Sequence, residues 1–471
     1  MNTTWPGREP AAPDREAALA PHEGIDPTRA NVNSDRHAAG ALILGGAHGS
    51  LAVARSLGRR GVPVWFVTDD HPIAKYSRYV ERSFDWRGPD DPNATGWLVG
   101  LARRHALEDW TLFAGGDREV RLVAENHELL ARAFRLTTPP WAVAQFACDK
   151  RLTHQHAVAV GVDCPWSLYP ACRADVAAAA LRFPVILKPT HRTGRNAFTD
   201  AKAWRVDDRA ALLSRYDEAA ALVGPDAIVI QELIPGAGDV QFSYAAVWDN
   251  GAPVASMIAR RLRQYPVDFG FTSTFVETFE HAPVEEAANR FLAALGFSGL
   301  VEVEFKYDVR DCRYKLLDVN PRAWTWIGLS EAAGVDLPWI QWRLSRGETA
   351  LEAAPAPRAR TGLAWTHASR DLVAAAQQIA RGALRPRDYA ASLARSARFA
   401  AFAMDDPAPA LVDLPIVIAR LLTRRFTNAP RSAAAVQPFG PAAREGFVAS
   451  GDCGPVATSP CSAPIVENVV E

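Results

Sequence analysis

Four side chains with oxygen donors lie at alternate positions of two neighbouring apolar segments. They are Glu302 and Glu304 in GLVEVEFKYD, and Asp318 and Asn320 in YKLLDVNPR. Both segments alternate apolar and polar residues, which is typical of strands with one buried face, and the charged stretch VRDCR between them favours a hairpin. Alternation puts the two glutamates on one face of the first strand, and Asp318 and Asn320 on one face of the second.

If these two faces coincide, Glu304, Asp318 and Asn320 form a cluster of hard oxygen ligands with Arg322 beside it. Such oxygens suit Mg²⁺, which retains several waters and commonly shares its site with substrate phosphates. The alternative is an ordinary hairpin with a solvated acidic face. The hairpin pattern alone does not decide between the two.

The lysines form a second group of candidates, because the basic residues are almost all arginine and only six are lysine. Arginine and lysine are not interchangeable at tight sites, so a lysine can mark a position that needs a compact ammonium group. Lys188 ends the apolar run FPVILKP and precedes the loop THRTGRN. Its ammonium group and the loop N–H groups could hold a phosphate there, whereas a surface lysine at a strand end is the alternative.

The apolar run IVIQELIPG ends in Gln231 and Glu232, and Asp239 follows a Pro-Gly turn. A strand edge that offers backbone groups to an adenine, followed by an acid for ribose hydroxyls, is a plausible nucleotide site. Taken singly, Glu232 and Asp239 would be ordinary loop acids.

A glycine turn, residues 45–49 (GGAHG), follows the first strand-like run of the chain. It lacks the G-x-G-x-x-G spacing of dinucleotide sites, although Asp69 and Asp70 end the next strand where a ribose-binding acid would lie. We therefore interpret the glycines as a tight strand-to-helix turn. No second histidine stands at ligand spacing from His48 or His191, so both are interpreted as polar loop residues.

The order of strand-like and helix-like runs divides the chain into five parts. Residues 1–38 and 431–471 lack periodicity and are expected to be a disordered leader and tail. Alternating strands and helices over 39–140 predict an α/β domain with a parallel sheet. Strands joined by short turns, with flanking helices, predict an α+β domain over 141–345, and residues 346–430 look mostly helical.

Composition is that of a soluble globular protein, with 48% hydrophobic and 22% charged residues and a net charge of −1. No basic block interleaved with aromatic residues occurs, which argues against a nucleic-acid binder. No apolar span is long enough to cross a bilayer, and no signal peptide is recognisable. The six scattered cysteines include no C-x-x-C pair, which favours reduced thiols and a cytoplasmic location.

Taken in order, CDKRLTHQHAVAVGVDCPWS, FPVILKP, VIQELIPGAGD and EVEFKYD…YKLLDVNPR resemble the ATP-grasp superfamily over about residues 145–325. The preceding 39–140 region resembles the smaller domain that usually comes before that fold. The resemblance implies an α/β N-terminal domain with a parallel sheet, then an α+β ATP-grasp domain with two lobes, then a helical C-terminal extension.

The resemblance also implies roles for individual residues and the cofactors ATP and Mg²⁺, with Mn²⁺ as an alternative ion. Arg322 would stabilise the transferred phosphoryl group. The residues that would contact ATP are Lys150 and Lys188 at the phosphates, Thr193 and Gly194 in the phosphate-covering loop, Gln231, Glu232 and Leu233 at the adenine, and Asp239 at the ribose. The metal ligands would be Glu304, Asp318 and Asn320.

Three departures from the family pattern leave room for a weakened or specialised enzyme, although none removes a required charge. The loop that carries Thr193 and Gly194 is poorer in glycine than the family's phosphate-covering loop. Gln231 stands where an acid is common. Asp318 stands where glutamate is usual, which shortens one metal ligand by a methylene group.

The reaction implied is the ATP-dependent activation of a small carboxylate as an acyl phosphate, which an amine then attacks to form an amide. Arg260 and Arg261 could hold the carboxylate, but alternation allows only one of them to face the cleft. The alternatives are carbamoyl- or carboxy-phosphate chemistry on bicarbonate, a catalytically weak ATP-binding regulatory protein, and a nucleotide-sugar or nicotinamide enzyme that uses the 39–70 turn. The sequence does not reveal the oligomeric state, although a homodimer is the commonest assembly of soluble enzymes.

Overall fold

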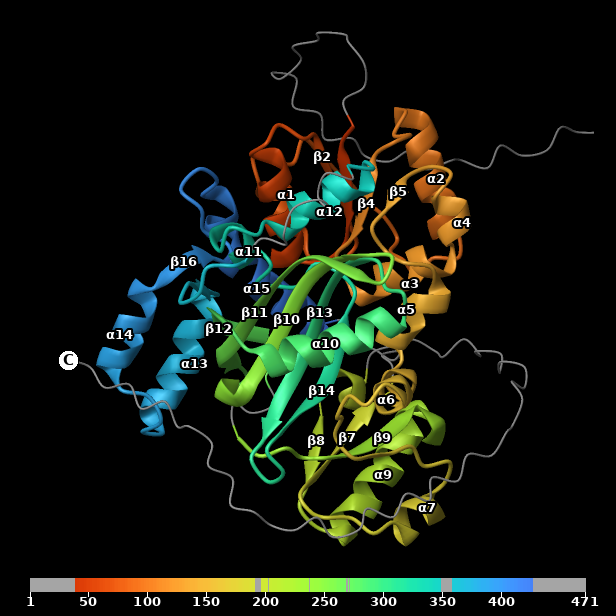
Figure 1. Ribbon diagram of the computed structural model, residues 1–471, viewed down its shortest axis with the longest axis vertical. Helices are drawn as coiled ribbons and strands as arrows, with labels where there is room; N and C mark the ends of the chain where they lie inside the picture. Colours follow the sequence, from red (N-terminus) through yellow and green to blue (C-terminus); the bar gives the residue numbers. More distant parts are fainter. Residues whose placement is uncertain are drawn as a thin grey trace, which may run out of the picture.

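The computed structural model describes residues 39–190, 196–201, 203–236, 238–267, 270, 272–348 and 358–426. The predicted leader and tail lie outside these ranges, and so do the predicted ATP contacts Thr193 and Gly194. Three sheets organise the described residues, and Figure 1 shows them from top to bottom as the N-terminal, large and small sheets.

The N-terminal sheet is parallel throughout, as the sequence predicts, with the strand order β3-β2-β1-β4-β5. Its inner strands are buried on both faces, which explains their unbroken apolar runs. The strands are β1 (Ala41–Leu44), β2 (Val64–Thr68), β3 (Arg82–Asp85), β4 (Thr111–Ala114) and β5 (Arg135–Leu136). The helices between them are α1 (His48–Gly58), the 3-10 helix η2 (Pro72–Tyr76), α2 (Ala94–His105), α3 (Asp117–Glu125) and α4 (His127–Leu130).

The small sheet is antiparallel, with the order β6-β9-β7-β8, and α7 and α9 lie beside it in Figure 1. Helices α5 (Trp141–Cys148) and α6 (Lys150–Ala159) lead into it from the N-terminal sheet. Its strands are β6 (Ser167–Leu168), β7 (Val185–Pro189), β8 (Trp204–Val206) and β9 (Ile228–Glu232). Its helices are α7 (Arg173–Ala178), α8 (Ala197–Asp200), α9 (Arg209–Val223) and the 3-10 turn η3 (Pro225–Ala227).

The large sheet is mixed and has the order β14-β13-β10-β11-β12-β15-β16, in which only β15 and β16 pair in parallel. Its first five strands follow the 3-10 turn η4 (Gly238–Val240). They are β10 (Gln241–Asp249), β11 (Ala252–Tyr265), β12 (Thr272–Phe279), β13 (Gly299–Asp308) and β14 (Arg313–Asn320). The helices among them and after them are α10 (Ala282–Ala294), α11 (Leu329–Ala332) and α12 (Leu337–Ser345).

The two faces of the large sheet bury different cores. Helix α10 covers one face, where Val301, Val303 and Phe305 of β13 pack with Phe291. The opposite face packs toward α1, through a cluster that includes Trp324 and Trp326. Both tryptophans are buried and belong to the core. Because residues alternate between these faces, the polar residues Glu302 and Glu304 lie on the face opposite α10.

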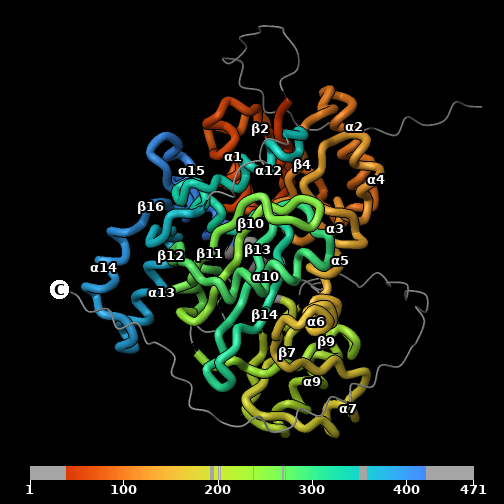
Figure 2. The backbone as a smooth tube through the Cα atoms, viewed as in Figure 1, coloured from red at the N-terminus to blue at the C-terminus, as the bar shows by residue number. Residues whose placement is uncertain are grey.

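The segment 358–426 is not purely helical, so the prediction of a helical extension is incomplete. It adds β15 (Ala364–Thr366) and β16 (Ser396–Phe399) to the edge of the large sheet, where they pair beyond β12. Its helices are α13 (Ala368–Ala380), α14 (Pro386–Ala394) and α15 (Ala408–Phe426). The tube in Figure 2 shows this blue segment returning from the sheet edge to the N-terminal region, where α15 contacts η2.

Helix α15 runs through Pro415. No helix in the described ranges has both the length and the apolar content needed to cross a membrane.

A buried ion pair attaches α13 to the large sheet. The guanidinium group of Arg263 on β11 donates to both carboxylate oxygens of Asp371, at 2.9 and 2.7 Å, and the Asp371 side chain is 0% exposed. Arg263 also donates to Ser392 Oγ and lies over the ring of Phe275. If the carboxylate were removed, the buried guanidinium group would keep its charge, and no water molecule would take the place of the carboxylate.

We expect Asp371→Ala to lower the free energy of unfolding by about 3–5 kcal/mol, because it leaves Arg263 charged and unpaired in the core. Urea denaturation measures the change. Asp217→Ala, which removes the partner of Arg173 from an exposed pair, is the matched control and should change the stability by less than about 1 kcal/mol. Equal effects of the two substitutions would contradict the structural role given to Asp371.

A second buried acid, Glu119 on α3, packs against the glycine turn after β1. Gly45 has φ +61°, and a Cβ atom there would lie 2.4 Å from Glu119 Oε1, so the turn needs glycine for both its conformation and its space. Burial is the main cause that raises the pKa of Glu119 to about 7. An acid whose pKa is higher in the folded state binds more protons folded than unfolded, so it makes the protein less stable as the pH rises.

The contribution of Glu119 to stability should therefore fall by about 3 kcal/mol as the pH rises from about 4.5 to about 7. Glu119→Gln, which cannot ionise, should remove this loss. The measurement is the difference in unfolding free energy between wild type and variant at pH 5 and at pH 8. A difference that stays constant with pH would show that Glu119 titrates normally.

Candidate functional site

The predicted hairpin is formed by β13 and β14, and its register pairs the candidate metal ligands directly. Glu304 lies opposite Asp318, and Glu302 lies opposite Asn320. Both pairs lie on the sheet face that does not contact α10. A bulge follows Glu304, so the regular pairing of these four residues ends there.

The two glutamates are buried and already have partners. Glu304 accepts hydrogen bonds from Gln241 Nε2 at 2.9 Å and from Arg261 at 3.1 Å. Glu302 accepts from Trp326 Nε1 at 3.0 Å and from Asn320 Nδ2 at 3.1 Å. Burial, followed by the negative charge of Glu304, raises the pKa of Glu302 to about 7.

Lys150 brings a cation to this hairpin from the start of α6. Its Nζ lies 2.9 Å from Asp318 Oδ1, although 168 residues separate the two in the sequence. Helix α6 begins at Lys150 because Asp149 caps it, accepting from the backbone N–H of Arg151 at 2.8 Å. Both side chains of the pair are partly exposed, so the ion pair is weak. Lys150 could therefore leave Asp318 for another anion, and Asp318 could bind another cation.

Lys188 lies on the small sheet, at the end of β7, as the sequence predicts. Its Nζ donates to Gln231 Oε1 at 2.8 Å, and Gln231 Nε2 donates to Ser167 Oγ at 3.0 Å. The backbone N–H of Leu233 donates to the carbonyl of Pro184 over a long distance of 3.3 Å. The predicted adenine hinge and phosphate lysine therefore lie on adjacent strands of one sheet.

The carboxylate of Glu232 belongs to a charged network that joins the small sheet to the β13–β14 hairpin. It lies 2.8 Å from Lys315 Nζ and 2.6 Å from Arg310, and both cations also bind Asp308. Burial alone would raise the pKa of Asp308, but hydrogen bonds from Arg310 and Lys315 hold it well below its usual range. The Glu232 side chain is thus occupied by protein groups, and its backbone N–H donates to the carbonyl of Trp166 at 3.0 Å.

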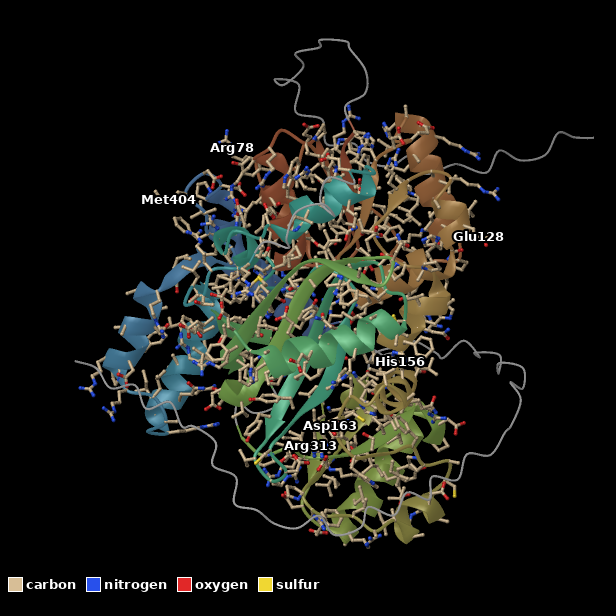
Figure 3. The ribbon with its side chains drawn as sticks, viewed as in Figure 1. Arg78, Glu128, His156, Asp163, Arg313 and Met404 are labelled. Atoms are coloured by element: carbon tan, nitrogen blue, oxygen red, sulfur yellow. The ribbon has the colours of Figure 1, made fainter. Side chains whose placement is uncertain are left out.

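A further ion pair joins the hairpin to the chain near the small sheet. Arg313, at the start of β14, lies 2.9 Å from Asp163 in the segment after α6. Figure 3 labels both side chains, which lie next to each other between the hairpin and the small sheet.

Arg322 follows the hairpin and reaches the N-terminal sheet. It pairs with Asp117 at the first position of α3, and it donates to Asn320 Oδ1 at 3.2 Å. Burial would lower the pKa of Arg322, but the charge and the hydrogen bond of Asp117 keep it raised. The arginine therefore stands between the candidate metal ligands and the N-terminal region.

The structure separates the two adjacent arginines of β11, as alternation predicts. Arg261 is buried and points to Gln241 and Glu304. Arg260 lies on the other face, 4.9 Å from the ring of Phe279 and 3.9 Å from Glu277. Of the two arginines, only Arg261 contacts the acidic side chains of the β13–β14 hairpin.

Sequence reasoning missed three residues of the cluster. Lys306 continues the face of Glu302 and Glu304, and its Nζ donates to the carbonyls of Ile234 at 2.9 Å and Gly236 at 2.7 Å. Burial lowers its pKa to about 8. The same two-residue period that marks the glutamates would have found Lys306. The other two are Gln241 and Asp117, which contact Glu304 and Arg322 from distant segments.

Asp239, the predicted ribose ligand, lies in η4 and is exposed. Its negative charge raises the pKa of Lys306, so Asp239 lies near the ammonium group of that lysine. The position is compatible with a ribose contact beside the strand that carries Gln231.

His48 corrects an interpretation from the sequence. It is not a loop residue, because it begins α1, is buried and bonds to Asp413 at 2.9 Å. The rings of His71 and His367 lie 5.5 and 4.4 Å from its own. These partners are distant in the sequence, so no local spacing reveals them.

The hairpin falls within a segment that matches a known family. Residues 249–381 match the family model described as ATP-grasp in the biosynthetic pathway with Ter operon. A search of curated protein sequences gave no significant match.

Solved structures share the fold at low sequence identity. An L-amino acid ligase from Bacillus licheniformis is 16% identical, with a TM-score of 0.52 over 70% of this chain and 79% of that chain. The biotin carboxylase domain of the 2-oxoglutarate carboxylase from Hydrogenobacter thermophilus, in complex with MgADP, ADP and bicarbonate, is 14% identical, with a TM-score of 0.53 over 70% and 74%. An N5-carboxyaminoimidazole ribonucleotide synthetase in complex with ADP is 12% identical, with a TM-score of 0.52 over 69% and 80%.

The family match covers the strands that carry the acidic cluster, and the shared fold extends over most of the chain. Over residues 249–381 the chain matches an ATP-grasp family model, and the similar solved structures show that it shares the ATP-grasp fold.

Proposed function

We propose that this protein is an ATP- and Mg²⁺-dependent ligase that activates a small carboxylate as an acyl phosphate and joins it to an amine. The observation that carries the proposal is the contact between Lys150 and Asp318, next to the paired Glu304. This contact brings the ammonium group of Lys150, which could bind a phosphate, next to Asp318 and Glu304, whose carboxylates could bind a metal ion. Separate parts of the chain supply these groups, as a site for a metal-bound triphosphate requires.

ATP would bind between the small sheet and the β13–β14 hairpin. The adenine would contact the backbone of Gln231, Glu232 and Leu233. A hydrogen bond from the N–H of Leu233 to the adenine would replace the long one that this N–H makes to the carbonyl of Pro184. Lys150 and Lys188 would contact the phosphates, with Thr193 and Gly194 covering them, and Asp239 would bind the ribose. The Glu232 carboxylate would position the hinge through Arg310 and Lys315.

The donor set fits Mg²⁺, or Mn²⁺ as an alternative, because it consists of two carboxylates and an amide oxygen. Glu304, Asp318 and Asn320 would hold the ion. When bound, it would neutralise negative charge on the phosphates of ATP. Arg261 and Gln241 already orient the Glu304 carboxylate, which is what outer partners of metal ligands do.

The chemical need for ATP follows from the poor reactivity of a carboxylate. Its oxygen is a poor leaving group, whereas phosphate is a good one. A carboxylate oxygen would attack the γ-phosphorus and release ADP. The amine nitrogen would then attack the acyl carbon and release phosphate, with its proton passing to solvent. Arg322 would stabilise the negative charge that moves between these groups, so catalysis is mostly positioning and electrostatics.

The names of similar proteins support an acid-activating ligase and leave the acid open. One similar structure is an L-amino acid ligase, and another carries bicarbonate. The deciding experiment is an ADP-release screen of the purified protein with Mg²⁺, using amino-acid pairs, other carboxylate–amine pairs and bicarbonate. Hydroxylamine should trap the acyl phosphate as a hydroxamate of the active carboxylate.

The results of this screen separate the alternatives. ADP release that needs both a carboxylate and an amine supports the ligase. Release with bicarbonate alone would replace it with carboxy-phosphate chemistry. Tight ATP binding without ADP release in every mixture would favour a regulatory ATP-binding protein.

We expect Lys188→Ala and Asp318→Asn each to lower the rate of ADP formation by about 100-fold or more, because Lys188 would neutralise charge on the phosphates and Asp318 would hold the Mg²⁺ ion that does the same. The matched control is Lys75→Ala, since Lys75 pairs with Asp85 at the N-terminal sheet, away from the cluster. Circular dichroism should show that all three variants fold. Wild-type ADP formation in either site variant would refute the site.

A further inference from the structure

A second group of metal-ligating side chains lies away from the hairpin. His48 Nε2 is 2.9 Å from Asp413 Oδ1, and the ligand atoms of His48, His367 and Asp413 all lie within 4.8 Å of one another. All three residues are buried. Two imidazoles and a carboxylate differ from the all-oxygen set of the hairpin, so this group would take a different ion.

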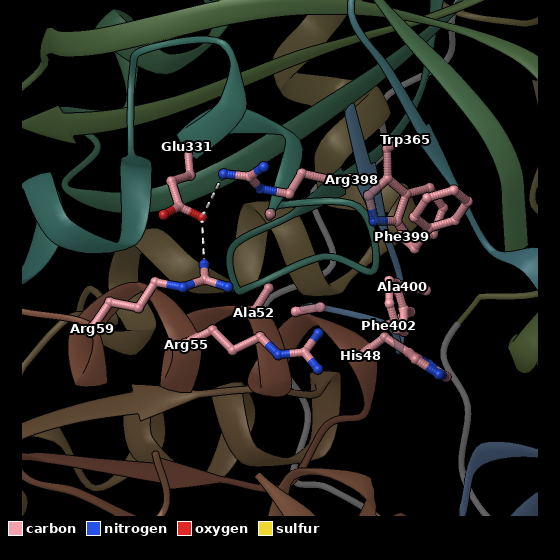
Figure 4. Close-up of a pocket in the computed structure, with 12 residues that line it drawn as sticks. His48, Ala52, Arg55, Arg59, Glu331, Trp365, Arg398, Phe399, Ala400 and Phe402 are labelled. Atoms are coloured by element: carbon pink, nitrogen blue, oxygen red, sulfur yellow. Dashed lines mark hydrogen bonds and ion pairs between the residues drawn. The ribbon is translucent and has the colours of Figure 1, made fainter. Parts of the chain in front are cut away.

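The three residues come from three separate elements. His48 begins α1, His367 lies between β15 and α13, and Asp413 lies on α15. Figure 4 shows His48 at the edge of a pocket whose wall includes Trp365 and Arg55. The group therefore joins the C-terminal segment to the first helix of the chain.

The hydrogen bonds of the cluster are incomplete in a specific way. His367 is 1% exposed, and its Nε2 has no hydrogen-bond partner among the described residues. The same holds for Nδ1 of His71, whose ring lies 5.5 Å from that of His48. Buried polar atoms in folded proteins nearly always have a partner, because a bare one has lost its water without compensation. A metal ion bound to His367 Nε2 would supply that partner.

A neutral imidazole has a lone pair on one ring nitrogen, and that lone pair can bind a metal ion. A simple His48–Asp413 ion pair would account for Asp413 but would leave the bare nitrogen of His367 unexplained.

We propose that His48, His367 and Asp413 bind a Zn²⁺ ion that fastens the C-terminal segment to α1. Two histidines and one carboxylate are a common zinc ligand set, in which water or another side chain takes the fourth position. His71, whose ring lies 5.5 Å from that of His48, is a candidate for that position. Mg²⁺ does not suit the set because it prefers oxygen ligands.

This site would act on the fold. Helix α15 also binds the N-terminal region through Arg420, which pairs with Asp70. A zinc ion would add a bond between elements that are 319 and 365 residues apart, and it would stabilise the folded state by binding that state alone. The proposal does not depend on the ligase reaction.

The test is a titration of the EDTA-stripped full-length protein with Zn²⁺ and with Co²⁺, in buffer that contains excess Mg²⁺. About one equivalent of metal should bind at this site with micromolar or tighter affinity, and Co²⁺ should give the visible absorption of a four-coordinate site with nitrogen and oxygen ligands. Zinc should also raise the melting temperature of the stripped protein.

Asp413→Asn is the main variant, because its amide oxygen can still accept from His48 while the charged ligand is lost. It and His367→Ala should weaken Zn²⁺ binding by about 100-fold or more and abolish the cobalt spectrum. His127→Ala, which changes a histidine outside the cluster, should bind like wild type. Lys188→Ala should also keep the metal, which separates this site from the nucleotide site.

Failure has a clear form. Wild-type protein that binds neither metal at micromolar concentrations would overturn the proposal. An Asp413→Asn variant that keeps the wild-type cobalt spectrum would also overturn the proposal, because cysteines or histidines elsewhere in the protein would then bind the cobalt. Circular dichroism of the stripped variants shows whether a loss of binding reflects a loss of fold.

Discussion

The pairing of β13 with β14 is the constraint on which the candidate site depends. Its register sets Glu304 opposite Asp318 and Glu302 opposite Asn320, on the face away from α10. A slip of one residue would turn each side chain of the slipped strand to the other face, and the apolar residues Val303 and Phe305 oppose such a slip because they are buried beneath α10. The hydrophobic core thus fixes the position of the acids.

The charges in the site compensate one another in the structure without ligands. Asp318 pairs with Lys150, Glu304 with Arg261, and Arg322 with Asp117. A buried charge without a partner would be costly, so the protein supplies opposite charges where a metal ion and a triphosphate would bring their own. Ligand binding at such a site is an exchange of partners. The partly exposed pairs, Lys150 with Asp318 and Arg322 with Asp117, should exchange more readily than the buried pair of Glu304 with Arg261.

The sequence was sufficient for features that depend on local periodicity. Alternation predicted the hairpin, the shared faces of its acids and the separation of Arg260 from Arg261, and apolar runs predicted the parallel N-terminal sheet. Periodicity carries no information on contacts between distant segments. The pairing of Arg322 with Asp117, the addition of β15 and β16 to the large sheet, and the meeting of His48 with Asp413 all needed the folded chain.

Glu232 shows that a family pattern can predict one role for a residue without predicting the contacts of its side chain. The pattern assigns the residue to the adenine hinge, and the structure does put it at the end of β9. Its carboxylate, however, binds Arg310 and Lys315 at the far end of the hairpin. The predicted hinge is therefore tied to the hairpin that carries the predicted metal ligands, whereas Lys188 contacts Gln231 within its own sheet. Any motion of the small sheet relative to the hairpin should move the phosphate lysine more than the hinge, because the charged network of Glu232 holds the hinge to the hairpin.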